Sequence, residues 1–335
     1  MADTRSDIPS VAERARPLAT GAPVVNVHFL GSTAGFVLGE EALVLVAMDG
    51  TQARVAVHGG AILSCAADGK RIVTGGDDGK VIVSDTAGRS TPVATDAKRR
   101  WIDRVAVARG GAIAWSAGKE TFVQIGNGTA QTLELPSTVG GLAFAAKGFR
   151  LAIAHYNGAT LWFPNAKAEP ERLAWKGSHL GATVSPDGRF LVTAMQEPAL
   201  HGWRLIDRKD MRMQGYSARV RSLDWTAGGK WLATSGSTQL ILWPFQSKDG
   251  PMGKTPRLLA PTETQVEIVA CHPRELITAV GYADGLILIV RIDDGAEILA
   301  RKPGDAPVTA LAWNNAGTLL AFGTEDGAAG IIDLA

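Results

Sequence analysis

The sequence is poor in several kinds of residue, and each shortage excludes a class of protein. Cysteine occurs only twice in 335 residues, too rarely for a disulfide-stabilised secreted domain, so Cys65 and Cys271 are expected to be buried thiols. Lys and Arg number 34 against 33 Asp and Glu, so no global charge attracts nucleic acid or anionic lipid. No stretch approaches the roughly 20 apolar residues of a membrane span, and the N-terminus lacks the apolar run of a secretory signal. The expected location is the cytoplasm.

Long helical patterns are also missing, whereas glycine is abundant at 39 residues. No segment sustains the 3.6-residue periodicity of an amphipathic helix, which makes a helical solenoid a poor interpretation. Short apolar runs of about 5–7 residues alternate instead with turn signals, and this pattern predicts an all-β fold.

One stretch shows the pattern most clearly, residues 219–243, RVRSLDWTAGGKWLATSGSTQLILW. Apolar residues within 220–225 predict one strand, and residues 231–235 and 240–243 predict two more. The intervening residues 227–230 contain two glycines, which tolerate the positive φ of a hairpin turn. Three short strands cannot bury two faces alone, so the unit requires neighbouring copies.

Copies recur along the chain with a period near 40 residues. Gly69, Gly110, Gly148, Gly188 and Gly229 mark equivalent turns and are separated by 41, 38, 40 and 41 residues. Such a period with four strands per unit is the signature of a β-propeller. The predicted units are 24–57, 58–97, 98–136, 137–176, 177–216, 217–262, 263–304 and 305–335.

The last unit contains only three strands, and a propeller with an open edge strand would invite aggregation. The segment Arg14–Thr20 is therefore predicted to form the outer strand of the last blade and to close the ring. The sequence predicts one closed propeller over residues 11–335, preceded by a disordered stretch over residues 1–10. Eight four-stranded blades are expected, or seven if the first, shortest unit is not a blade of its own.

Several units resemble the WD40-repeat family, whose pattern reads SPDGxxLxTxxxDGxVxLWD. Ser185–Leu191 matches the first turn, Thr74–Val81 the second turn, and Leu161-Trp162 and Leu242-Trp243 the end of the third strand. The resemblance covers residues 24–335. The Trp-Asp pair and the usual Gly-His are missing, so hydrogen-bond networks of Asp, His, Ser and Trp are expected to be largely absent. Apolar packing between blades should then supply most of the stability.

Candidate catalytic residues do not gather in the sequence. The six histidines lie in different units without the spacing of metal ligands. Gly75–Gly79 lacks the Gly-Lys-Ser/Thr and the following helix of a phosphate loop, and Ser185 lies in a turn rather than a nucleophile elbow. We therefore expect no enzyme activity, no metal and no cofactor.

The resemblance implies that the ring of loops entering the inner strands binds peptides or partner proteins. Trp101 is the strongest candidate, because Ile102 and Val105 fill core positions and leave Trp101 to point outward beside arginines. Packing of Trp101 against the adjacent blade is the alternative. The predicted partner-binding residues are Trp101, Arg100, Arg104, Tyr156, Ser178, Glu197, Tyr216, Arg219, Arg221, Gln265, Tyr282 and Glu325.

Three functions follow as hypotheses. The first is a non-catalytic scaffold that binds a protein or peptide partner and acts as a monomeric propeller within a complex. The second is an RNA-associated propeller, based on the basic residues of 98–104 and on Arg204, Arg208, Lys209 and Arg212. The third is a propeller enzyme, such as a quinoprotein dehydrogenase or a hydrolase, with its site at the central channel.

Overall fold

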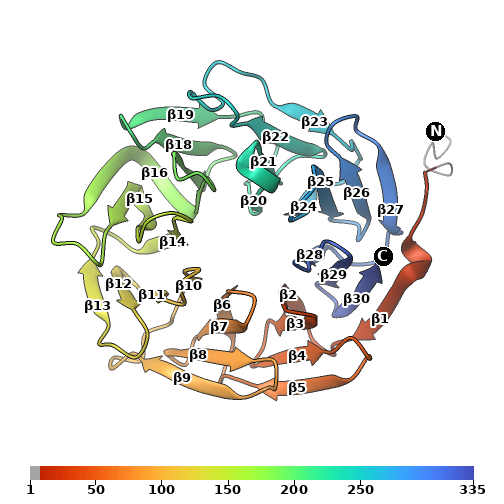
Figure 1. Cartoon of the computed structure of the whole chain (residues 1–335), viewed down its shortest axis with the longest axis horizontal. Coiled ribbons are helices and arrows are strands. Elements are labelled where there is room, and N and C mark those ends of the chain that lie inside the picture. The colour runs from red at the N-terminus through yellow and green to blue at the C-terminus, as the bar shows by residue number, and fades with distance from the viewer. Residues whose placement is uncertain (1–7) are drawn as a thin grey trace.

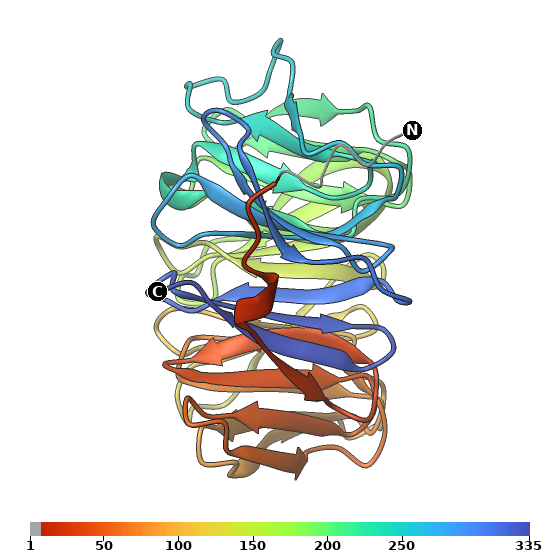
Figure 2. The ribbon, with the colours of Figure 1, turned by 90° about the vertical axis from the view of Figure 1, so that its right-hand side faces the viewer.

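The computed structural model describes residues 8–335, which form a ring of sheets around a central channel (Figure 1). These residues contain 30 strands and two 3-10 helices, η1 (Ala12–Arg14) and η2 (Ala227–Gly229). In side view the strands stack as a thick disc (Figure 2). Over the described range, no helix has the length and apolar character needed to cross a membrane. The prediction of an all-β propeller is confirmed.

Apart from the last sheet, which takes its rim strand from the N-terminal segment, the four-stranded sheets are built from consecutive antiparallel strands, the first at the channel and the last at the rim. The second and third strands are the most apolar and are buried, whereas rim strands alternate or are exposed. The first half of the ring contains three four-stranded sheets. Their strands are β2 (Val24–Leu30), β3 (Thr33–Leu38), β4 (Ala42–Val46) and β5 (Gln52–Ala56); β6 (Ile62–Ala67), β7 (Arg71–Gly76), β8 (Lys80–Asp85) and β9 (Ser90–Thr95); and β10 (Arg104–Val107), β11 (Ile113–Ala117), β12 (Glu120–Gln124) and β13 (Gln131–Glu134).

The second half of the ring follows the same order. The stretch 219–243 forms the three strands and the turn that its sequence predicts, although its first strand is short. The four-stranded sheets here are β20 (Leu223–Trp225), β21 (Trp231–Thr234), β22 (Leu240–Pro244) and β23 (Arg257–Leu259); β24 (Val266–Cys271), β25 (Ile277–Tyr282), β26 (Ile287–Arg291) and β27 (Glu297–Arg301); and β28 (Val308–Trp313), β29 (Leu319–Thr324), β30 (Ala328–Asp333) and β1 (Ala15–Ala19).

The predicted units 137–176 and 177–216 share a single sheet of six strands. It contains β14 (Val139–Phe144), β15 (Leu151–Trp162), β16 (Glu171–Val184), β17 (Phe190–Met195), β18 (Leu200–Arg204) and β19 (Lys209–Met213). The long strand β16 pairs with β15 over residues 171–174 and at Ser178, and with β17 over residues 179–184.

Counted as continuous sheets in residues 8–335, the propeller therefore has seven blades, and the prediction of eight is wrong. Seven blades were expected only if the first unit was not a blade of its own, but this unit does form a sheet of its own. The two units of the six-stranded sheet instead share β16, because no turn interrupts it; Gly177, with φ +106°, lies where the strand changes partners.

The N-terminal segment closes the ring, as predicted. Strand β1 pairs antiparallel with β30 along its whole length, from Ala15 opposite Ile332 to Ala19 opposite Ala328. Just before it, the Val11 amide donates to the carbonyl of Leu299 (2.9 Å), and the Leu299 amide donates to Pro9 (2.8 Å). Figure 2 shows this segment running across the edge of the disc. Residues 1–7 of the stretch predicted to be disordered lie outside the described residues.

Apolar packing joins neighbouring sheets through small residues on their second strands. A Cβ added at Gly75 would lie 2.6 Å from Cγ2 of Ile102, and one at Gly281 would lie 2.7 Å from Cγ1 of Val308. Each glycine thus accommodates the apolar residue at the start of the next inner strand. The predicted dependence on packing between blades has this structural basis.

Hydrogen-bond networks within sheets are nevertheless more frequent than the sequence indicated. His58 bonds through its two ring nitrogens to Asp78 (2.9 Å) and Thr74 (2.8 Å). In another sheet, Trp243 donates to the hydroxyl of Tyr216 (2.7 Å), which also bonds to Thr234 (2.9 Å). In this sheet Tyr216 takes the place that His58 has in the other, so the Gly-His motif does not reveal the network.

Candidate functional site

The channel mouth is the end of the ring at which the inner strands begin. Six inner strands carry a β-bulge there, where the pairing register shifts next to the first paired residue. A bulge sets two residues of one strand against one of its partner and redirects a side chain. The residues within these bulges all line the channel; they are Val25, Leu63, Gly140, Leu180, Glu267 and Thr309.

The residues predicted from the sequence lie just before the inner strands, and the sequence did not indicate these bulge residues. The rule that successive side chains of a strand point to opposite faces of the sheet does not account for a bulge. What these residues share in the sequence is their position, because each one directly follows the first paired residue of its inner strand. An alignment of the repeats therefore identifies these channel-lining residues only when the position of the bulge is known.

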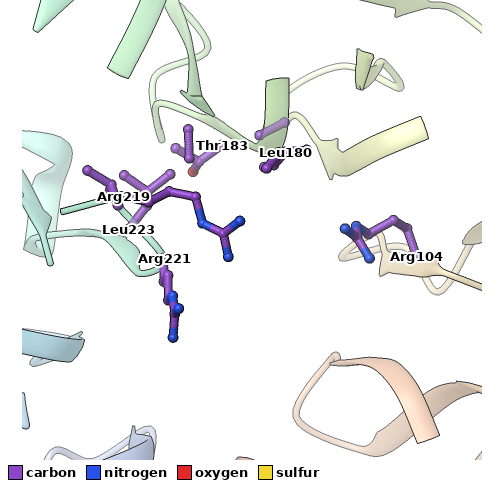
Figure 3. A pocket seen from close by; sticks show the side chains of 10 residues that line it. Arg104, Leu180, Thr183, Arg219, Arg221 and Leu223 are labelled. Carbon is purple, nitrogen blue, oxygen red and sulfur yellow. The ribbon is translucent and has the colours of Figure 1, made fainter. Parts of the chain in front are cut away.

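Three arginines line the channel near its mouth. Arg104, Arg219 and Arg221 border one cavity of about 540 Å³ together with small and apolar residues of β16. A neighbouring cavity of about 530 Å³ shares Arg104 and Arg221. Figure 3 shows Arg219 and Arg104 facing each other across an open space, with Arg221 on the same side as Arg219. Among residues 8–335, no Asp or Glu borders either cavity, so this half of the channel is positively charged.

Each arginine is held differently. Arg104 donates from Nε to the carbonyl of Gly140 (2.7 Å) and from Nη1 to the carbonyl of Asp103 (2.6 Å), and burial lowers its pKa. Arg219 donates to the Gln196 side chain at 3.3 Å. Arg221 lies 3.7 Å from the carboxylate of Glu267. Arg104 and Arg219 thus donate to neutral oxygens, whereas Arg221 has a carboxylate partner.

Aromatic side chains lie exposed at the same end. Tyr156 is 57% exposed and borders a cavity of about 370 Å³ with Arg104 and Ser178. Trp101, in the loop entering β10, is 62% exposed. The expectation that Trp101 points outward is therefore confirmed, and the alternative of packing against the adjacent blade is wrong. The structure brings Arg104, Tyr156 and Ser178 together as predicted.

The other polar residues of the predicted surface have more local roles. Arg100 forms ion pairs with Asp96 (2.7 Å) and with Glu120, which fixes its loop. Gln265 donates to the hydroxyl of Ser217 (3.0 Å), a contact between two loops of the mouth. Glu325 lines the channel on the side of Glu267, and Glu197 is exposed.

Two predicted surface residues belong to the core. Tyr282 is fully buried and donates to the carbonyl of Ala260 (2.6 Å), and Tyr216 is 9% exposed within the network described above. The prediction that they face a partner is wrong. Both hydroxyls are used inside the sheets, and a buried tyrosine that has a hydrogen-bond partner packs as a large core side chain.

Most histidines are tied into the blades rather than gathered at a site. His155 bonds to Thr160 (2.9 Å), His179 bonds to Thr193 (2.7 Å), and His272 bonds to the carbonyl of Gly317 (3.0 Å). Residues 8–335 contain no group of three or more His, Cys, Asp or Glu placed to hold a metal ion. Cys271 is buried, whereas Cys65 is half-buried against the channel, and neither forms a disulfide.

The basic residues behind the RNA hypothesis do not form one patch. Arg104 lies on an inner strand, whereas Lys209 and Arg212 lie on the rim strand β19. Arg204 pairs with Asp207 and Asp249, and Arg208 pairs with Glu171. These carboxylates already neutralise two of the proposed phosphate contacts.

One buried histidine gives the protein a predictable response to acid. His201 stacks on Trp175 (4.0 Å between ring centres) and is fully buried. Burial lowers its pKa to about 3, helped by the charges of His179 and Arg212, although the Asp210 carboxylate lies 3.6 Å away. In the unfolded chain the pKa of histidine is about 6.5. The unfolded state therefore binds the proton more readily between these values, and stability falls as the pH falls from about 6.5.

Urea unfolding at pH 7 and pH 4.5 tests this prediction. Replacing His201 with Phe keeps an aromatic ring but removes the titrating group. The wild type is expected to lose on the order of 1–2 kcal/mol more than His201→Phe between the two pH values, allowing for partial screening. Equal losses in the two proteins would contradict the prediction.

A profile of the WD domain, G-beta repeat, matches residues 51–85 and 209–244, and a profile of the anaphase-promoting complex subunit 4 WD40 domain matches residues 269–335. No curated protein matches the sequence. The crystal structure of the computationally designed Ika8 protein is similar, with a TM-score of 0.76 and 16% sequence identity over 94% of this chain and 97% of that chain. At this identity the likeness concerns the fold alone. The matched repeats and the ring of sheets together support a WD40-repeat β-propeller.

Proposed function

We propose that this propeller is a non-catalytic interaction scaffold that binds a protein or peptide partner at the channel mouth. The observation that carries the proposal is the exposure of Trp101 and Tyr156 at the end of the ring where Arg104, Arg219 and Arg221 enter the channel. Tryptophan, tyrosine and arginine are the residues that most often dominate binding energy at protein interfaces.

Two further observations support a scaffold. WD40 propellers generally bind protein partners, and one matching profile is named for a domain of a multisubunit complex. The histidines that bond to threonines stabilise the blades and do not converge on the channel. We propose accordingly that the protein uses no cofactor, acts in the cytoplasm, and works as a monomeric propeller within a complex.

Affinity capture with paired variants tests the proposed face. Trp101→Ala combined with Arg219→Glu removes the exposed indole and reverses one channel charge. We expect at least a tenfold loss of captured partner, because truncated hot-spot residues typically cost 2 kcal/mol or more. Quantitative mass spectrometry of the captured proteins measures the loss.

A matched control makes equivalent changes at the opposite end. Ile206→Ala with Arg109→Glu removes an exposed apolar side chain and reverses one charge at turns away from the mouth. This variant should retain the partners of the wild type. Recovery of the same partners by both variants would show that the channel mouth is not the binding face.

A further inference from the structure

We infer that the channel mouth recognises acidic side chains, so that the partner inserts a segment bearing Asp or Glu carboxylates between Arg104, Arg219 and Arg221. This inference rests on the proposed function and names the chemistry of the partner. The three guanidinium groups come from two inner-strand regions and converge on one space (Figure 3). Guanidinium groups bind carboxylates through paired, charge-assisted hydrogen bonds.

The charge distribution favours an anion in this half of the channel. The two adjoining cavities are bordered by three arginines and, among the residues that line them, by no Asp or Glu. Glu267 and Glu325 lie together in a different cavity that also reaches Arg221. Walls of protein around a cleft concentrate the field of its charges, which raises the local concentration of an oppositely charged ligand.

Arg104 is fixed in position before any ligand binds. Its Nε and Nη1 donate to two backbone carbonyls, and it lies beside Gly140 and Gly141, which have no side chains to fill the space. A guanidinium has five N–H donors, so donors remain for a ligand. A fixed guanidinium loses little side-chain entropy on binding, which favours affinity.

The cavity shared by Arg104 and Arg221 also has an apolar lining. Val25 and Leu63 are 43% and 37% exposed, and both border the cavity that contains Arg104 and Arg221. An acidic residue with an apolar neighbour therefore fits the cavity better than a chain of uniform charge. A peptide also fits better than a nucleic acid, because Glu267 and Glu325 in the adjoining cavity would repel a polyanion.

Glu267 supplies an internal competitor for the ligand. Its carboxylate lies 3.7 Å from Nη1 of Arg221, where we expect a ligand carboxylate to bind. Removing this charge should free Arg221 and strengthen binding, whereas removing the arginines should weaken it. The inference thus predicts changes of opposite sign at neighbouring residues.

Fluorescence anisotropy with a labelled peptide tests the inference. The probe is a twelve-residue synthetic peptide of alternating glutamate and leucine pairs flanked by glycine and serine. The reference probe has glutamine in place of glutamate. An extended peptide of this length spans roughly 40 Å. For the glutamate probe we expect about a tenfold loss of affinity in Arg219→Gln/Arg221→Gln and about a threefold gain in Glu267→Gln. Binding should weaken as salt increases.

Control variants change the same charges at the opposite end of the inner strands. Arg109→Gln/Arg274→Gln and Glu275→Gln alter exposed residues of turns remote from the mouth and should leave the affinity within twofold. Circular dichroism and thermal unfolding verify that each variant is folded. Because Glu267→Gln is expected to increase affinity, misfolding cannot imitate its effect.

The outcomes separate this inference from the proposed function. Equal affinity for both probes, or equal effects of mouth and control variants, would overturn it, as would tighter binding of a single-stranded oligonucleotide. Partner capture that is lost in Trp101→Ala/Arg219→Glu but retained in Arg219→Gln/Arg221→Gln would overturn only the acidic recognition. Partner capture unchanged in both variants would overturn the proposed function as well.

Discussion

A chain that lacks residues 1–19 is expected to lose the folded monomer. The deletion removes β1, which supplies the fourth strand of the last sheet and pairs with β30 at five positions. It also removes Leu18, which packs against the core between the last and first sheets. Five backbone pairs and one apolar side chain together contribute on the order of 5 kcal/mol, similar to the whole stability of many domains.

The exposed edge of β30 adds a second consequence. Its unpaired backbone groups and its apolar residues Ile331 and Ile332 would form a free strand edge, which is a template for association. Size-exclusion chromatography with light scattering should therefore show oligomers or aggregates in place of the monomer. Deletion of residues 1–7 is the matched control, because it keeps every contact of residues 9–19. A monomeric 20–335 chain with the unfolding midpoint of the wild type would refute the prediction.

Gly140→Ala is expected to destabilise the protein by about 3 kcal/mol or more. A Cβ at residue 140 would overlap the carbonyl oxygen of His179 and would lie 2.9 Å from its carbonyl carbon and 3.0 Å from the Cα of Leu180. These are backbone atoms of the neighbouring inner segment, so no side chain can rotate to make room. Overpacking usually costs 1–3 kcal/mol, and a rigid backbone contact lies at the upper end or beyond.

The same substitution should also disturb the channel. The carbonyl of Gly140 accepts the Nε–H of Arg104, so a shift of the β14 backbone moves the best-ordered arginine of the mouth. Urea unfolding measures the stability, and the glutamate probe measures the channel. Gly110→Ala is the control, because a Cβ there meets no atom within 4 Å; its stability should change by less than about 0.5 kcal/mol. Equal unfolding midpoints for the two variants would rule out the steric argument.

Much of the architecture was predictable because it depends on short-range patterns. Turn glycines at equivalent positions, such as Gly69 and Gly188, have positive φ in the structure and mark the period of the repeats. The missing fourth strand of the last unit predicted that residues 14–20 close the ring, and β1 does so. The count of blades failed at β16, because the sequence between two units did not show that one strand would pair on both sides.

The candidate site was only partly predictable. Trp101, Arg104 and Tyr156 lie at the mouth as expected, since their places in the repeat assign them to that end. Tyr216, in a loop, and Tyr282, at the end of β25, were expected on the same surface but are buried, because Thr234 and the carbonyl of Ala260 offer hydrogen-bond partners from other parts of the chain. Their repeat positions do not distinguish an exposed tyrosine from one bonded to a distant residue.

By itself, the sequence determined that strands of a few residues alternate with tight turns about every forty residues, and that the two ends of the chain share the last sheet. These features follow from the local preferences of glycine, of β-branched residues and of aromatic residues. Tertiary structure alone decided which side chains enter the channel, because the bulges at Val25, Leu63 and Glu267 depend on pairing with a neighbouring strand. It also decided that Arg104 of one repeat meets Arg219 and Arg221 of another, since the distance between these repeats is set by closure of the ring.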